Sequence, residues 1–209
     1  MFASSNMCIM SIHAIQDLLG AHVAVRAGYP FRGAIDEIRG GAVQAVQMKD
    51  LDPLHGIDWG GVIRTQLTGR REPDWLLPED LLFVARGTRF HASCVGELPG
   101  PAVCGPHLFQ LRVRAGHELL PAFLAWQMNQ APFQRALRRA AEGSSQLSVR
   151  RPVLESLPIG LPPLADQERI VALARLAQRE RQVHDLLIRN RERQFESIAE
   201  ALASTSGKA

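Results

Sequence analysis

The chain has 209 residues, of which 46% are hydrophobic, and it carries a formal net charge of +3. That length can bury one good core, so one domain with an appendage is the expected organisation. There is no apolar run of eighteen residues, no signal-peptide pattern at the start, and only three cysteines, which excludes a membrane span and a disulfide framework. These features predict a cytoplasmic protein.

The N-terminal half is predicted to be mainly β-structure. Residues 11–19 place apolar side chains at helical spacing before Gly20, which predicts one short helix. Strands are expected at residues 22–27, 42–48 and 81–85, with loops at 28–41 and 51–61. Trp59 and Trp75 fall in loop-like stretches. Either indole could stack on a base, but a packed position in the core is the preferred interpretation.

Residues 90–95 and 102–113 are strand-like around a turn near Pro99, which predicts a hairpin. Across it, His91-x-x-Cys94 would face Cys104-x-x-His107, a quartet that suggests zinc. Residues three apart on a regular strand point to opposite faces, however, so a zinc-stabilised fold is a minor alternative and no metal is expected. A disulfide between the two cysteines is not expected in a reducing compartment.

Positive charge is concentrated in the middle of the chain. Residues 86–151 hold nine arginines and three glutamates, a net charge of +6, whereas residues 1–85 carry −3. Arginine supplies 22 of the 24 basic residues. A guanidinium group can bind phosphate or a guanine edge through two parallel hydrogen bonds, which favours nucleic acid as a partner. A GC-rich genome would produce the same arginine bias, so the composition alone does not distinguish a nucleic-acid partner from codon usage.

Three helices are predicted in the C-terminal part. The first covers residues 121–130 and begins with proline, and the second covers residues 132–142 and ends at Gly143. The third covers residues 165–203 without proline or glycine, about 57 Å at 1.5 Å per residue. Its apolar face, which we expect to pair with another helix, comprises Ile170, Leu173, Leu176, Val183, Leu187, Ile198 and Leu202.

That face is interrupted by polar residues, which makes it an imperfect coiled coil. The interruptions are Glu180, Asn190, Arg191 and Gln194. An alternative is a helix that folds back as a hairpin with a break near residues 189–193.

The segment GSSQLSVRRPVLESLPIGLPPLADQERIV, residues 143–171, joins a polar, cationic loop to a proline-stiffened connector and a helix start. Its order of parts resembles the end of a target-recognition domain in type I restriction-modification DNA specificity subunits. The resemblance implies an α+β fold, with one mixed α/β target-recognition domain over residues 1–163. A coiled-coil-like spacer helix would follow over residues 164–209.

In that family a full-length subunit has two recognition domains, held apart by two antiparallel spacer helices. No internal repeat is visible here, so the resemblance covers one copy of each. We therefore expect a two-fold homodimer through the C-terminal helix. The resemblance also implies double-stranded DNA and a modification methyltransferase subunit as partners. S-adenosylmethionine would belong to that subunit, so no cofactor is expected in this chain.

Candidate DNA contacts are cationic and amide side chains around the later strands and helices, which can reach phosphates or base edges. They are Arg86, Arg89, Arg138, Arg139, Ser144, Ser145, Gln146, Arg150 and Arg151. Taken singly, each is better explained as a solvated charge or a helix cap than as a DNA contact. The expectation therefore concerns the group as a whole.

Catalysis by this chain is not expected. A magnesium-dependent nuclease needs clustered carboxylates near a lysine, yet the only internal lysine, Lys49, lies between turn-like residues. The glycine-rich loop and Asn-Pro-Pro-aromatic element of an adenine methyltransferase are missing, as is a phosphate-binding loop. The alternative from another class is a helical adaptor that binds proteins through its arm and does not read DNA.

Overall fold

The structure is a computed structural model that describes residues 14–53, 55–69, 72–143 and 147–205. The chain divides into two compact units, Met1–Arg169 and Ile170–Ala209. The first is a mixed α/β unit with several small sheets that also holds the start of the long C-terminal helix, and the described residues of the second are the rest of that helix, so the predicted fold class is confirmed. The functional boundary predicted after residue 163 stays a prediction.

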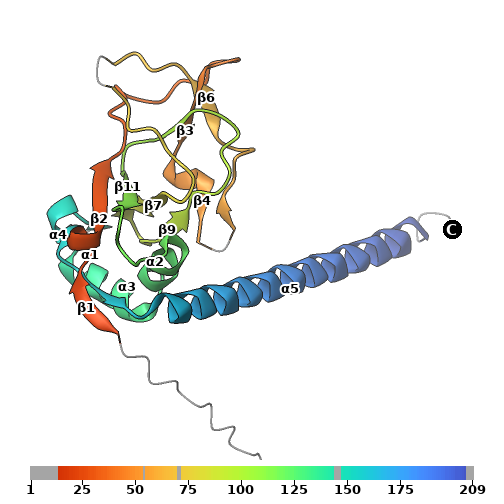
Figure 1. Cartoon of the computed structure of the whole chain (residues 1–209). Coiled ribbons are helices and arrows are strands. Elements are labelled where there is room, and N and C mark those ends of the chain that lie inside the picture. Colours follow the sequence, from red (N-terminus) through yellow and green to blue (C-terminus); the bar gives the residue numbers. More distant parts are fainter. Residues whose placement is uncertain (1–13, 54, 70–71, 144–146, 206–209) are drawn as a thin grey trace, which may run out of the picture. The chain divides into compact units, whose positions relative to one another are not determined.

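The largest sheet of the first unit is antiparallel, with strand order β2-β11-β7-β9 (Figure 1). Its strands are β2 (Val23–Ala27), β11 (Leu108–Val113), β7 (Leu81–Val84) and β9 (Ala92–Cys94). Every residue of β7 is buried, as expected for a continuous apolar run in the interior of a sheet. The strands predicted at residues 22–27 and 81–85 are confirmed.

A second sheet has strand order β10-β3-β6, where β10 (Ala102–Cys104) runs parallel to β3 (Val43–Val46) and β6 (Ile63–Thr65) runs antiparallel to it. The predicted hairpin between residues 90–95 and 102–113 is therefore wrong. β9 pairs with β7 instead, and the second stretch breaks into β10 and β11 at His107, whose φ is 69°. Alternation of polar and apolar residues predicted the strands but carries no information about their partners.

Short elements occupy the predicted loop at residues 51–61. A 3-10 turn, η1 (Met48–Asp50), leads into β4 (Leu51–Asp52), which pairs with β5 (Gly56–Ile57). The loop prediction is thus only partly correct.

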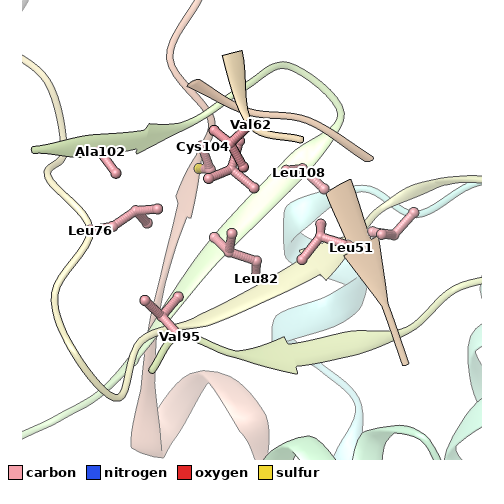
Figure 2. Packing of buried hydrophobic residues seen from close by; sticks show 10 residues of the cluster. Leu51, Val62, Leu76, Leu82, Val95, Ala102, Cys104 and Leu108 are labelled. Atoms are coloured by element: carbon pink, nitrogen blue, oxygen red, sulfur yellow. The ribbon is translucent and has the colours of Figure 1, made fainter. Parts of the chain in front are cut away.

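The main core cluster lies among these strands and the loops between them. Figure 2 shows side chains from β4, β7, β10 and β11 pointing toward one another. Trp59 is partly buried and packs against this cluster, which confirms the core interpretation for that indole. Trp75 is 39% exposed, so the core position preferred for it is wrong.

The N-terminal helix predicted at residues 11–19 is wrong over the part that the structure describes. Residues Ile15–Leu18 form strand β1, which pairs antiparallel with β13 (Pro158–Leu161), and only Leu19–His22 are helical, as α1. The side chains of β1 are exposed, and backbone pairing with β13 is what holds the strand. The spacing of apolar residues along the sequence does not reveal such pairing. Gly20 closes no long helix. It allows close packing, since a Cβ there would lie 2.9 Å from that of Glu155.

The remaining helices are α2 (Pro121–Met128), α3 (Ala131–Ala140), α4 (Arg151–Glu155) and α5 (Leu164–Thr205). α3 ends before Gly143, which is not its cap, because the backbone is already extended at Ala141. α5 is one unbroken helix of 42 residues, about 63 Å long, so a hairpin break near residues 189–193 is wrong (Figure 1). No helix among the described residues is long and apolar enough to cross a membrane.

Candidate nucleic-acid interface

A short β-ribbon brings together two of the cationic segments noted in the sequence. β8 (Arg86–Gly87) pairs antiparallel with β12 (Leu147–Ser148), which places Arg86 opposite Ser148. The ribbon is extended on one side, where the Val149 amide donates to the Ala85 carbonyl at 2.9 Å. Gly87 has a φ of 128°, a conformation that other residues rarely adopt.

The predicted contact residues of the ribbon are solvent-exposed where the structure describes them. Arg86, Arg89, Arg150 and Arg151 are all exposed, and the first two lie on or just after β8. The predicted contacts Ser144, Ser145 and Gln146 lie outside the described residues. The structure therefore gathers four of the predicted cations around one ribbon.

Two of those cations form ion pairs within the unit. Arg150 pairs with Glu142, and Arg151 Nε lies 2.8 Å from Glu155 Oε1. Such exposed pairs contribute little to stability, typically below about 1 kcal/mol, because water screens them. Glu142 is bonded to Ser148 of the ribbon, so the first pair lies beside it, whereas the second lies within α4 (Arg151–Glu155).

Helix α3 adds a cationic face. Arg135, Arg138 and Arg139 are exposed and stand at i, i+3 and i+4, whereas Phe133 and Leu137 on the other side are buried. The helix has no acidic residue, and no ion pair engages these three arginines among the described residues. Like charges at this spacing destabilise a helix by about 0.2–0.5 kcal/mol per pair. A surface that keeps this repulsion is suited to an anionic ligand.

Arg135 was missed in the sequence, although its spacing from Arg138 and Arg139 is a signal that could have found it. Arginines in a last turn also stabilise the carboxyl end of a helix dipole, which would explain Arg138 and Arg139 alone. That explanation does not extend to Arg135, which lies in the middle of α3.

The chain passes directly from α3 to the ribbon. Two residues after the helix ends at Ala140, Glu142 exchanges backbone hydrogen bonds of 3.0 and 2.8 Å with Ser148. At the other end of α3, the Gln134 side chain donates to the Met128 carbonyl at 2.7 Å. The cationic helix and the cationic ribbon are thus consecutive along the chain in the first unit. We call their exposed arginines together the arginine surface: Arg86, Arg89, Arg135, Arg138, Arg139, Arg150 and Arg151.

The residues of the proposed zinc quartet do not form a ligand set. Among the described residues, no group of three or more His, Cys, Asp or Glu side chains is placed to hold a metal ion. Cys94 and Cys104 are not joined by a disulfide. Burial raises the pKa of the Cys104 thiol to about 12 and lowers the pKa of His91. The quartet therefore does not act as a unit.

The start of α5 is fixed by Gln167, which lies in the segment that carries the family resemblance and whose burial was not predicted. Gln167 is fully buried, and its Oε1 accepts a hydrogen bond from the Leu120 amide at 2.8 Å. Its Nε2 donates to the carbonyls of Glu118 (2.9 Å) and Pro162 (2.8 Å). The hydrogen bonds of Gln167 therefore hold the start of α5 directly after the proline-containing segment.

In the second unit, most of the predicted pairing face of α5 is exposed. Leu173, Leu176, Val183, Leu187, Ile198 and Leu202 are 53–67% exposed, and only Ile170 is half-buried. Leu186, Ile188 and Phe195 are also exposed and were missed, because they lie beside the main stripe. An apolar surface of this extent on a helix is typical of an association site.

Comparison with solved structures shows where this fold recurs. The HsdS subunit from Thermoanaerobacter tengcongensis is similar, with a TM-score of 0.58 and 18% identity over 80% of this chain and 38% of that chain. A structure described as showing complex assembly and conformational transition of the type I R-M system gives the same values. The type I restriction-modification S subunit from M. genitalium has a TM-score of 0.54 and 16% identity, over 88% of this chain and 44% of that one.

The chain therefore spans 38–44% of the length of these structures. No protein-family model and no curated protein sequence matches it. At these identities the similarity shows the fold, and the predicted structural resemblance to type I specificity subunits is confirmed at that level.

Proposed function

We propose that this chain is a DNA-recognition subunit that directs a separate modification methyltransferase, with or without a restriction partner, to a specific sequence and has no catalytic activity of its own. The observation that carries the proposal is the arginine surface, built on a fold similar to that of type I specificity subunits. The exposed like charges of α3 repel one another, and a duplex would offset that repulsion because it supplies regularly spaced phosphates.

The two parts of the arginine surface have different proposed roles. Arg135, Arg138 and Arg139 point into solvent from a rigid helix and would contact phosphates, which fixes the position of the protein on the duplex. The ribbon would enter a groove, where Arg86 or Arg150 can bind a guanine edge. Ser144, Ser145 and Gln146 remain proposed contacts, since they join Glu142 to this ribbon along the chain.

The proposed partners follow from the apolar face of α5. That face would pair with a second copy of the chain and offer a further surface to the methyltransferase, which would bring its own S-adenosylmethionine. The recognition domain is proposed to end at residue 163, where the proline-stiffened connector gives way to the helix.

A duplex library with a randomised centre tests the proposal by electrophoretic titration, with the chain alone and with its methyltransferase. We expect one sequence to be enriched. Converting Arg135 and Arg138 to glutamine should weaken binding to all duplexes and lower the slope of log Kd against log salt by about one for each phosphate that is no longer bound. Arg32→Gln together with Arg39→Gln removes the same two charges from exposed sites in the acidic N-terminal half and should leave the slope unchanged.

The competing function is a helical adaptor that uses α5 alone, which the exposed apolar face favours. This function predicts that the chain binds the methyltransferase through α5. It also predicts that no duplex sequence is enriched in the titration and that the slopes of log Kd against log salt are equal for the two arginine variants. That combination of results would reject DNA recognition.

A further inference from the structure

One carboxylate lies beside the arginines of the ribbon. Residues 119–151 contain five arginines, and Glu142 is the only acidic residue in that stretch. Its Oε1 accepts a hydrogen bond from Nη2 of Arg150, and the side chains of Arg150 and Glu142 are 68% and 59% exposed. An exposed ion pair contributes less than about 1 kcal/mol to stability, so folding alone does not account for this carboxylate.

The backbone holds both members of this pair in fixed positions. Glu142 exchanges two backbone hydrogen bonds with Ser148 of β12. Val149 is buried, and the Arg150 carbonyl accepts from the Leu154 amide of α4 at 3.0 Å. Two side chains anchored at their backbones in this way lose little conformational freedom when they bind a ligand together.

The carboxylate changes what the neighbouring guanidinium can bind. A phosphate bound to Arg150 would be repelled by Glu142, because both are anionic. The arginines of α3 have no acidic residue on their helix and are therefore better placed for phosphates. The edge of a base carries no net charge, so a neighbouring carboxylate does not repel it. Arg150 is thus better suited to a base edge than to the DNA backbone.

The pair is chemically complementary to one kind of base pair. Across the major groove, guanine offers the acceptors N7 and O6, and its cytosine then offers the amino donor N4. The ion pair presents guanidinium donors beside a carboxylate acceptor, on a two-stranded ribbon of the kind that fits this groove. We propose that Arg150 and Glu142 together read one C·G base pair, with Arg150 donating to guanine and Glu142 accepting from the cytosine amino group.

An A·T base pair satisfies the two side chains less well. Adenine offers a single acceptor, N7, beside its amino donor, so the guanidinium loses its second hydrogen bond. The thymine partner offers the acceptor O4, which would face the Glu142 carboxylate without a proton between them. This inference rests on the proposed DNA recognition and adds to it the base pair that the ribbon selects.

Selection from the randomised duplex library, repeated with variants of the full chain, tests the proposal. Arg150→Ala and Glu142→Ala should each lower the preference for C·G at the same position of the enriched sequence, at least about fivefold for Arg150→Ala. Glu155→Ala removes the carboxylate that pairs with Arg151 and should leave every base preference unchanged. Arg150→Ala that keeps all base preferences but lowers the salt slope by about one would show a phosphate contact and overturn the proposal.

Modified duplexes test the same contacts with the parent chain, so the result does not depend on how a variant folds. Replacing the guanine by 7-deazaguanine removes N7, and N4-methylcytosine replaces the amino hydrogen that faces the major groove. Each should weaken parent binding roughly threefold or more. Arg150→Ala should be insensitive to the first change and Glu142→Ala to the second. Undiminished binding of the parent to both duplexes would overturn the two contacts.

The outcomes also separate this inference from the proposed function. A library in which the parent chain enriches no sequence, with or without its methyltransferase, would reject DNA recognition and this inference with it. An enriched sequence whose base preferences are the same for the parent and for Glu142→Ala would reject the reading of C·G alone and leave DNA recognition standing.

Discussion

Replacing Gln167 with methionine should destabilise the first compact unit, because this side chain anchors the start of α5 to the loop before α2. The amide makes three hydrogen bonds of 2.8–2.9 Å to main-chain groups of Leu120, Glu118 and Pro162. Methionine has a similar shape, so packing is largely kept while all three hydrogen bonds disappear.

The size of the effect follows from which main-chain groups are left without partners. Pro162 is buried and Leu120 is half-buried, so their carbonyl and amide groups cannot turn freely to water, whereas Glu118 is exposed. An unsatisfied buried group costs about 1–3 kcal/mol, so two of them predict a loss of about 2–6 kcal/mol. The third bond is replaced by water at little cost.

Urea unfolding followed by circular dichroism and tryptophan fluorescence measures this change, since the tryptophans all lie in the first unit. Gln182→Met makes the same substitution in α5 on the side away from the apolar face and should change the free energy of unfolding by less than about 0.5 kcal/mol. Equal stabilities for the two variants would refute the anchoring role.

Gln167→Glu separates the hydrogen bonds from packing. The carboxylate can still accept from Leu120, but it cannot donate to the two carbonyls and would be repelled by them. Burial therefore raises the pKa of the introduced carboxyl above that of the unfolded chain. Its stability should be highest below that unfolded value and should be lost as pH rises through the folded one. A flat pH profile relative to the parent chain would contradict this reasoning.

Three further predictions concern buried groups. Asp80 is 1% exposed and accepts hydrogen bonds from Gln110 and Arg112, so Asp80→Ala should cost about 3–5 kcal/mol in urea unfolding. Burial raises the pKa of Asp50 above 3.8, so the stability linked to it is full below 3.8 and is lost as pH rises through the folded pKa. As pH falls, the free energy of unfolding of the parent chain should therefore rise relative to that of Asp50→Asn, which urea denaturation at a series of pH values would measure. With a pKa of about 12, the Cys104 thiol should resist alkylation near pH 8 until the protein is denatured, and peptide mapping by mass spectrometry would reveal early labelling.

Several elements could be predicted because their signals are local. Thirty-nine residues without proline or glycine, with apolar side chains at helical spacing, indicated the long helix at residues 165–203, now seen as α5. The continuous apolar run at residues 81–85 indicated the buried strand β7. The order of features in residues 143–171 indicated the family resemblance. For α5 and β7, the residues that carry the sequence signal are the same residues that form the helix or strand.

Pairing between distant segments could not be predicted in this way. β9 was expected to pair with β10, yet it pairs with β7, and Ile15–Leu18, which were expected in an N-terminal helix, form β1 against β13. Strand partners depend on which apolar faces can be buried together, and the small difference in local propensity over four residues is easily outweighed by such contacts.

The candidate interface combines both kinds of information. By itself, the sequence determined that arginine is concentrated between residues 86 and 151 and that an apolar stripe follows, because charge and periodicity are properties of the chain. Only the tertiary structure decided that Arg86 lies opposite Ser148, that Arg135 joins Arg138 and Arg139 on one exposed face, and that Gln167 is buried. Burial and proximity depend on long-range packing, which local sequence patterns do not contain.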